Sequence, residues 1–333
     1  MSQFKHDTYR GARVLITGGL GFLGSSLAHA LVQSGAKVTL LDNLNPIYGG
    51  NRFNIEEIKD SVITIIDDVR NQDRLRQLIP VADYIFHFAA QVSHIDSGTI
   101  PLEDNDTNAR AYLALLDLCR QLNPKVKILF PSSRLALGKL LSSPVSEDHP
   151  ARPLNIYGVH KLSAEHYSRI YAQSYGLRTV VLRLTNPYGP RQQIKHSKYS
   201  IPGWFMRLAM EEKEITMFGA GEQKRDYIYV DDVTDAFLMA GASSNTDGKL
   251  YNCGTGDSIT FREMIDEILS VVGSGSVRSV PWPENYEREE TGDFEVDISL
   301  LRREAGWNPH TGLHDGLERM YQYYRRVKDH YVA

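Results

Sequence analysis

Thr17-Gly18-Gly19-Leu20-Gly21-Phe22-Leu23-Gly24 lies between a run of apolar and β-branched residues, Arg13–Thr17, and a helical pattern over residues 25–34. The first, third and fourth glycines permit, in that order, a tight turn, close approach of the backbone to a pyrophosphate, and close packing of the helix on the strand. The start of the helix then offers unpaired N–H groups to the phosphates. This strand, turn and helix predict the first unit of a dinucleotide-binding sheet.

Further short apolar runs alternate with helical patterns through the first half of the chain. They predict strands over residues 37–41, 62–66, 84–87, 126–130 and 179–184. Strands separated by helices imply right-handed crossovers and a mostly parallel sheet. We therefore expect an α/β fold with a Rossmann-type, doubly wound parallel sheet built from residues 1–184, to which the chain returns around residues 226–255.

The texture changes after Leu184, where Pro, Gly and Tyr become frequent and the alternation weakens. A helix is expected over residues 260–272, with Thr260 as its N-cap and Glu263 completing a capping box. Another is expected over residues 313–331, and Asp231-Asp232 is expected to cap a further helix. Residues 185–333 thus predict a smaller, mixed α/β lobe.

Composition excludes several classes of protein. With 37 basic and 41 acidic residues the net charge is -4, so no nucleic-acid partner is expected. Two cysteines, Cys119 and Cys253, give no disulfide framework, and neither they nor the eleven histidines have the spacing of metal ligands. No segment approaches the roughly 20 apolar residues that cross a bilayer. The polar start of the chain has no signal sequence. A cytoplasmic protein without metal or membrane contact is expected.

An acid follows the second predicted strand. Asp42 stands about 20 residues beyond the glycines, where a carboxylate binds the adenosine ribose hydroxyls. It would repel a 2′-phosphate, and no arginine follows in Asn43-Leu44-Asn45, so NAD is favoured over NADP. Asp68-Val69 after the third strand and Phe88-Ala89-Ala90 after the fourth are weaker signals at the same edge of the sheet.

A phenol and an ammonium group share one helix face at Tyr157 and Lys161. Lysine favours the phenolate and would lower the pKa of the tyrosine from about 10 towards neutral pH. Such a tyrosine can take a proton from a sugar hydroxyl while hydride leaves the same carbon for nicotinamide. Ser132-Ser133 ends the fifth strand, where a hydroxyl could bind the reacting oxygen.

The chain as a whole resembles the extended short-chain dehydrogenases/reductases, in the NAD-dependent nucleotide-sugar epimerase/dehydratase family that includes the UDP-glucose 4-epimerases. The matching segments, besides those already quoted, are His87 to Gln91, Asn108, Gly138, Arg183 to Pro190, Arg225 to Asp232 and Tyr251 to Gly254. The resemblance implies that Ser133, Tyr157 and Lys161 are catalytic. It also implies an NAD site at Gly18, Gly21, Phe22, Leu23, Gly24, Asp42, Asn43, Asp68, Val69, Phe88, Ala89, Ala90, Gln91, Thr107, Tyr157, Lys161 and Pro187.

The resemblance further implies that a nucleotide sugar binds between the sheet and the lobe, through Ser133, Tyr157, Asn186 and Arg225. Arg191, with Gln192 and Lys195 in the same basic loop, could meet an acidic sugar such as a uronic acid. Family members usually form homodimers through a four-helix bundle. Here it would use the helices around residues 113–122 and 157–175, with Ile170 and Tyr171 as candidate contacts.

Departures from the family pattern narrow the reaction. The 4,6-dehydratases carry an Asp-Glu pair after the catalytic hydroxyl, where this chain has Arg134 and Leu135. The related decarboxylases also carry an acid at the second of these positions. Without those acids, elimination and decarboxylation are disfavoured. Leu137 stands where family members usually carry a tyrosine, directly before Gly138. Glu290 stands where many relatives have a phosphate-binding arginine, a loss for which the nearby Arg288 could compensate.

The expected function is NAD-dependent C4 epimerisation of a UDP-sugar through a transient 4-keto intermediate. Three alternatives stay open: a 4-keto nucleotide-sugar reductase, a dehydratase with acids from elsewhere in the lobe, and a non-catalytic NAD-binding sensor. The sequence does not identify the nucleotide, the sugar, the inverted carbon or the pathway.

Overall fold

The computed structural model describes residues 6–283 and 290–332. At its centre is a seven-stranded sheet of order β11-β6-β5-β4-β1-β2-β3, in which every neighbouring pair is parallel. The strands are β1 (Arg13–Thr17), β2 (Lys37–Asp42), β3 (Val62–Ile66), β4 (Tyr84–His87), β5 (Lys127–Ser133), β6 (Arg178–Leu184) and β11 (Lys249–Cys253). The strand order reverses at β1, which pairs with both β2 and β4. Open sheets bind ligands at the carboxyl edge beside such a reversal.

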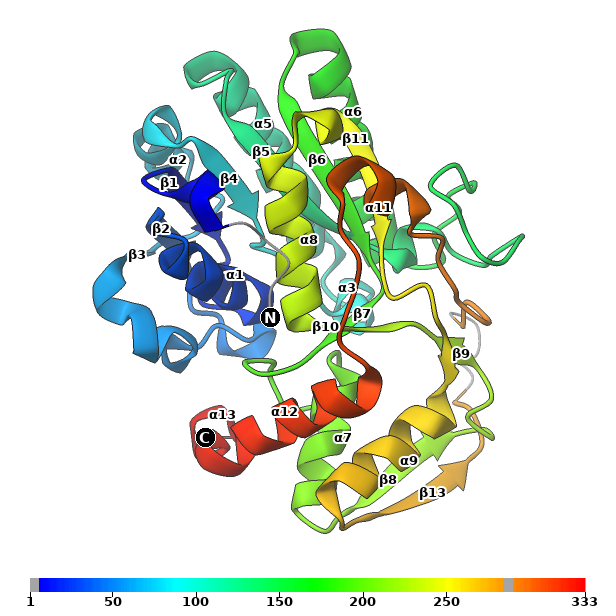
Figure 1. The fold of residues 1–333 in the computed structure, drawn as a ribbon. Helices are drawn as coiled ribbons and strands as arrows, with labels where there is room; N and C mark the ends of the chain where they lie inside the picture. Colours follow the sequence, from blue (N-terminus) through cyan, green and yellow to red (C-terminus); the bar gives the residue numbers. More distant parts are fainter. Residues whose placement is uncertain (1–5, 284–289, 333) are drawn as a thin grey trace.

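Helices cover both faces of this sheet (Figure 1). One face carries α1 (Phe22–Gln33), α8 (Val230–Ala242) and α11 (Ser299–Ala305), and the other carries α2 (Gln72–Leu78), α5 (Ala111–Leu122) and α6 (Ile156–Tyr175). Neighbouring strand residues therefore enter different cores. Phe86 and Leu129 pack with α1 and α8, whereas Ile85 and Ile128 pack with α5. Burial on both faces explains why these strands read as continuous apolar runs.

The smaller lobe lies below the carboxyl edge of the sheet in Figure 1. Its helices are α7 (Ile201–Met210), α9 (Phe261–Val272), α12 (Leu313–Val327) and α13 (Asp329–Val332). Its strands form three pairs: β7 (Asn186–Tyr188) with β10 (Tyr227–Tyr229), β8 (Glu214–Phe218) with β13 (Ser276–Val280), and β9 (Lys224–Arg225) with β12 (Ile259–Thr260). The capping box of Thr260 and Glu263 at the start of α9 is confirmed. Helix α11 packs on β11 and α8 of the sheet domain, although its residues fall in the range predicted for the lobe. The domain boundaries given above remain a prediction.

Short helical segments complete the described chain. They are η1 (His6–Tyr9), η2 (Pro46–Tyr48), η3 (Arg52–Ser61), η4 (Ile79–Val81), α3 (His94–Ser97), α4 (Pro101–Asn105), η5 (Asp106–Arg110), η6 (Arg134–Ala136) and η7 (Ser244–Thr246). The prediction that Asp231-Asp232 caps a helix is wrong, because both residues lie inside the first turn of α8 and Tyr229 occupies the cap position. The carboxylate of Asp232 instead accepts the backbone N–H groups of His310 and Thr311 and so fixes the chain before α12.

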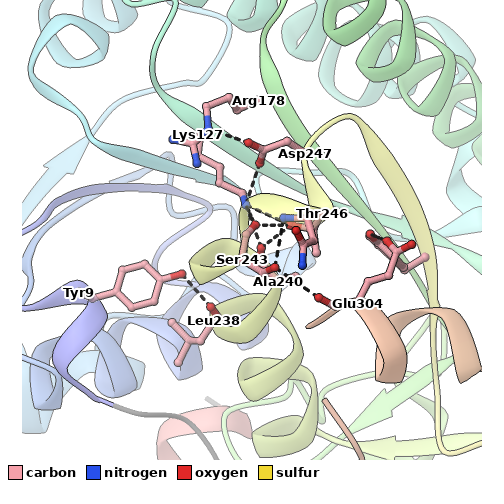
Figure 2. Close-up of polar contacts among 11 residues, drawn as sticks. Tyr9, Lys127, Arg178, Leu238, Ala240, Ser243, Thr246, Asp247 and Glu304 are labelled. Atoms are coloured by element: carbon pink, nitrogen blue, oxygen red, sulfur yellow. Dashed lines mark hydrogen bonds and ion pairs between the residues drawn. The ribbon is translucent and has the colours of Figure 1, made fainter. Parts of the chain in front are cut away.

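A buried lysine ties the start of β5 to the end of α8 (Figure 2). Lys127 is fully buried, and its ammonium donates to the carbonyl oxygens of Ala240 and Ser243 and to Thr246 Oγ1. It also pairs with Asp247 at 2.9 Å, and Arg178 binds the other oxygen of that carboxylate at 2.8 Å. A cation at the carboxyl end of α8 satisfies carbonyls that the helix leaves free and interacts favourably with its dipole.

Candidate active site

A cavity of about 1360 Å³ lies between the carboxyl edge of the sheet and the lobe. Its walls come from the loops after β1 to β6 and from α7 and β8 of the lobe. Every residue predicted to bind the cofactor lines it: Gly18, Gly21, Phe22, Leu23, Gly24, Asp42, Asn43, Asp68, Val69, Phe88, Ala89, Ala90, Gln91, Thr107, Tyr157, Lys161 and Pro187. The sequence signals scattered over four strand ends are thus brought together in one place.

The glycine turn has the shape that the sequence implies. Gly18 has φ +69°, and a Cβ atom there would lie 2.6 Å from the backbone nitrogen of Ala89. A Cβ atom on Gly24 would lie 2.1 Å from the carbonyl oxygen of Gly18. Helix α1 begins at Phe22, and Gly21 at its cap position has no side chain to satisfy the first N–H groups. These N–H groups face the cavity and fit the pyrophosphate of a dinucleotide.

Asp42 is held rigidly at the end of β2. Its two oxygens accept the backbone N–H groups of Leu20 at 2.9 Å and Leu44 at 2.8 Å. Burial raises the pKa of this carboxyl, and the two N–H groups oppose that shift. A carboxylate has about four acceptor positions, so it can still receive ribose hydroxyls from the cavity.

Arg70 also lines this part of the cavity, although it was not among the residues predicted to bind the cofactor. Its guanidinium binds both oxygens of Asp68 at 2.8 Å, and Asn43 donates to the same carboxylate at 3.0 Å. The hydrogen bonds from Arg70 come first among the causes that lower the pKa of Asp68 to about 2. The charge of Arg70 is therefore compensated, and the site keeps the preference for an unphosphorylated ribose that Asp42 predicts.

Ser133, Tyr157 and Lys161 meet where β5 ends and α6 begins. Asn155 caps α6 by accepting the N–H of Gly158 at 2.9 Å. Gly158 allows the helix to approach the 133–135 segment, since a Cβ atom there would lie 2.4 Å from the carbonyl oxygen of Leu135. Both side chains line the cavity, and the hydroxyl of Ser133 acts to lower the pKa of the Tyr157 phenol.

Lys161 lies beneath the tyrosine. Its ammonium donates to the carbonyl oxygen of Pro131 at 3.1 Å and lies 5.7 Å from the centre of the Tyr157 ring. Burial lowers the pKa of Lys161 to about 8. The prediction that Lys161 brings the pKa of Tyr157 towards neutral pH is wrong for the protein alone: burial raises that pKa, the charge of Asp104 raises it further, and only the hydroxyl of Ser133 lowers it. Desolvation of the phenolate outweighs the neighbouring cation.

A polar network that the sequence did not reveal supports this pair from α4. Asp104 is fully buried and binds Nδ1 of His160, the residue before Lys161. Its other oxygen accepts from Asn108 at 3.1 Å, and Asn108 also donates to the carbonyl oxygen of Gln91 at 2.9 Å. Asp104 lies 56 positions before His160, so no local motif could have shown the contact.

Asn186 and Arg225, predicted to contact the nucleotide sugar, also line the cavity. Asn186 donates to the carbonyl oxygen of Asp226 at 2.7 Å. Arg225 donates to the carbonyl oxygens of Lys224 at 2.7 Å and Gly292 at 2.8 Å, and it forms an ion pair with Glu290. Glu290 therefore neutralises a cation of the site, and Arg288 lies outside the described residues.

The basic loop after β7 does not supply the expected contacts. Arg191 does not line the cavity, and its guanidinium lies 3.5 Å from Oγ of Ser26, a buried residue of α1. Lys195 does not line the cavity either, whereas Gln192 does. The prediction that Arg191 contacts the sugar finds no support, because its side chain does not line the cavity although Gln192 and Gln193 do.

Other groups of residues bear on the exclusions made from sequence. Within residues 6–283 and 290–332 no cluster of three or more His, Cys, Asp or Glu side chains could hold a metal ion. Cys119 and Cys253 are buried and free. Among the helices of the described chain, none is long and apolar enough to cross a membrane.

Comparison with known proteins agrees with this geometry. The NAD dependent epimerase/dehydratase family model matches residues 14–254. A putative UDP-glucose 4-epimerase of Methanocaldococcus jannaschii is 32% identical over 312 residues, which cover 92% of this chain and 96% of that protein. A dTDP-glucose 4,6-dehydratase of Streptomyces niveus is 28% identical over 324 residues, 94% of this chain and 93% of that protein.

Among solved structures, the UDP-glucose 4-epimerase of Thermus thermophilus in complex with NAD superposes with a TM-score of 0.84 at 30% identity, covering 95% of this chain and 99% of that one. The glycine turn, Asp42 and the compensated Arg70 fit the same cofactor here. The chain therefore belongs to the NAD-dependent epimerase/dehydratase family, as an enzyme of the extended short-chain dehydrogenase/reductase type that uses NAD.

Proposed function

We propose that the protein epimerises C4 of a UDP-sugar through a transient 4-keto sugar. One observation carries the proposal: Ser133 and Tyr157 line the same cavity, while Arg134 and Leu135 occupy the positions where related dehydratases carry acids. Inverting C4 needs one group that moves a proton, whereas elimination needs a further acid. The names of the putative UDP-glucose 4-epimerase and of the solved 4-epimerase add support.

In this proposal each catalytic side chain has a separate task. Tyr157 takes the proton of the C4 hydroxyl and later returns it, and Ser133 holds the same oxygen by a hydrogen bond. Lys161 binds the nicotinamide ribose and keeps a positive charge beneath the phenol. NAD, when bound, would supply the acceptor and donor of hydride for C4, and its positive charge would favour the phenolate. The network of Asp104 and His160 fixes the helix turn that presents Tyr157.

Asn186 and Arg225 are proposed to contact the nucleotide sugar at the lobe side of the cavity. The volume of about 1360 Å³ exceeds the roughly 300–1000 Å³ of ordinary small-molecule sites, as a site for two nucleotides requires. We assign residues 1–184 and the returning segment around 226–255 to cofactor binding, and the remainder of 185–333 to substrate binding.

A homodimer through α5 and α6 is also proposed. These two helices pack side by side on the outer face of the sheet. Ile170 is 46% exposed, and Leu102 and Val159 lie exposed on α4 and α6. Tyr171 is a weaker contact candidate, since it is half-buried and donates to Asp117 at 3.3 Å. The free, buried cysteines support the cytoplasmic location that we propose.

The test is incubation of the purified protein with UDP-, GDP-, CDP- and dTDP-sugars, followed by NMR of the C4 proton. We expect a mixture of axial and equatorial C4 products from a UDP-sugar without added cofactor. Tyr157→Phe should lower kcat by about 100-fold or more, and Tyr175→Phe, at an exposed position of the same helix, should not change it. Consumption of free NADPH with a single reduced product, or a 4-keto-6-deoxy product, would refute the proposal.

A further inference from the structure

Arg134, the residue after Ser133, points into the cavity and is held there by neutral groups. Its Nε donates to Asn186 Oδ1 at 3.1 Å, and its Nη1 donates to Thr291 Oγ1 at 3.0 Å. Its guanidinium carbon lies 5.4 Å from the centre of the Phe294 ring. Of the five N–H donors of an arginine, two are used by these residues, so three remain for a ligand. The guanidinium is thus fixed in position while part of its hydrogen-bonding capacity is left for a ligand.

The charge of Arg134 has no carboxylate partner among the described residues. The acid nearest in the site, Glu290, pairs with Arg225 and accepts the N–H of Gly292 at 2.9 Å. Burial and the charge of Arg225 lower the pKa of Arg134 to about 9, against the opposing charge of Glu290. By contrast, the buried Arg183 binds Glu165 with two hydrogen bonds. A desolvated cation without a counter-ion is unfavourable, and a bound anion would relieve that cost.

The position of Arg134 indicates which part of a substrate supplies this anion. Arg134 directly follows Ser133, and both residues line the cavity together with Tyr157. Its partner Asn186 belongs to β7, directly beyond β6. A group bound by Arg134 therefore belongs to the same sugar ring as the reacting carbon. The planar fork of arginine matches the two oxygens of a carboxylate.

We propose that Arg134 binds a carboxylate on the sugar ring, so that the substrate is a nucleotide-activated acidic sugar such as a uronic acid. This inference rests on the proposed function of the site but concerns recognition rather than chemistry. The sequence suggested an acidic sugar through Arg191 and Lys195, neither of which lines the cavity. Arg134, which does line the cavity and forms no ion pair with a described residue, comes instead from the loop that carries the catalytic serine.

The experiment compares UDP-glucuronic acid with UDP-glucose, which differ at C6 as carboxylate and hydroxymethyl. We expect the unaltered enzyme to have the higher kcat/KM for UDP-glucuronic acid. Arg134→Gln should raise KM for that sugar by about 10- to 100-fold, as expected for a lost charge-assisted hydrogen bond, with less than about 3-fold change for UDP-glucose. Arg169→Gln, at an exposed position on α6, is the matched control and should change neither.

Two further variants keep the inference testable if Arg134→Gln loses stability. Thr291→Val removes a hydrogen bond that aims the guanidinium but keeps its charge, and it should weaken UDP-glucuronic acid selectively by a smaller factor. Arg134→Lys keeps the positive charge without the planar guanidinium. Its KM for UDP-glucuronic acid should lie between those of the unaltered enzyme and Arg134→Gln. Equal loss for both sugars would overturn the inference, because it would place Arg134 at the diphosphate or in packing.

A binding measurement separates this inference from the proposed reaction. In Tyr157→Phe, where no turnover is expected, the dissociation constants of the two UDP-sugars are measured by calorimetry. Preference for UDP-glucuronic acid that disappears with Arg134→Gln supports the carboxylate site even if no C4 inversion is found with the unaltered enzyme. Equal affinity for both sugars before the Arg134 substitution would overturn the carboxylate site, whatever the reaction proves to be.

Discussion

Replacing Lys127 with methionine removes the ammonium that joins β5 to α8 while keeping most of the side-chain volume. Loss of one partner from a buried ion pair usually costs about 3–5 kcal/mol. Here Asp247 keeps its bond to Arg178 at 2.8 Å. The hydroxyl of Thr246 can still donate its one hydrogen to the carbonyl of Ala240 at 2.6 Å or to that of Ser243 at 2.7 Å. The expected loss is therefore at the lower end, about 3 kcal/mol, which for 333 residues lowers Tm by about 4 °C.

The assay is thermal unfolding of Lys127→Met beside Arg178→Met. Arg178 binds the same carboxylate, but its side chain is 41% exposed. Such a pair contributes at most about 1 kcal/mol. Bound NAD should be equal in both variants, because Lys127 and Ser133 occupy opposite ends of β5, about 20 Å apart. A Tm shift of Lys127→Met below about 1 °C, or equal shifts for the two variants, would refute this assignment of the stabilising charge.

Two other substitutions test the cofactor turn and the pH dependence of stability. Gly24→Ala places a Cβ atom 2.1 Å from a backbone oxygen and should displace α1 by about 1 Å. Purified enzyme should then retain little NAD, whereas Gly312→Ala, in open space, should retain all of it. Burial lowers the pKa of His87 to about 3. Between about pH 6.5 and 3 the imidazole is therefore protonated in the unfolded chain but not in the folded one, so the free energy of unfolding falls as pH decreases below about 6.5. His87→Phe should flatten the pH dependence of the unfolding free energy between pH 6.5 and 3, and the exposed His166→Phe should not.

The sheet was predictable because its strands are buried on both faces. Strands β1, β3 and β4 begin and end where the apolar runs do. Strand β5 extends past the predicted Phe130 because Pro131 and the two serines, which break the apolar pattern, still pair with β6. Helix α1 begins at Phe22 rather than at residue 25, since glycine-rich turns carry little helical signal of their own. The helix predicted over residues 313–331 is interrupted at Lys328.

The candidate site was predictable where a motif is local and not where two distant segments meet. Tyr157 and Lys161 are one helical turn apart, so their joint position followed from spacing. The contact between Asp104 and His160 joins α4 to α6 and depends on tertiary packing alone. The pKa of Tyr157 went opposite to prediction for the same reason, because burial is a property of the whole fold.

Arg134 and Glu290 make most sense when they are considered together. In the pattern of the 4,6-dehydratases an acid follows the catalytic hydroxyl and many relatives carry an arginine at the position of Glu290. In this chain the two charges have changed places. Since Glu290 neutralises Arg225, the cation left without a carboxylate partner among the described residues of this wall is Arg134, next to Ser133. Relative to that pattern, positive charge has moved from the diphosphate side of the wall towards the sugar ring. This arrangement of charges favours a substrate that carries a negative charge on the sugar ring in addition to those on the diphosphate.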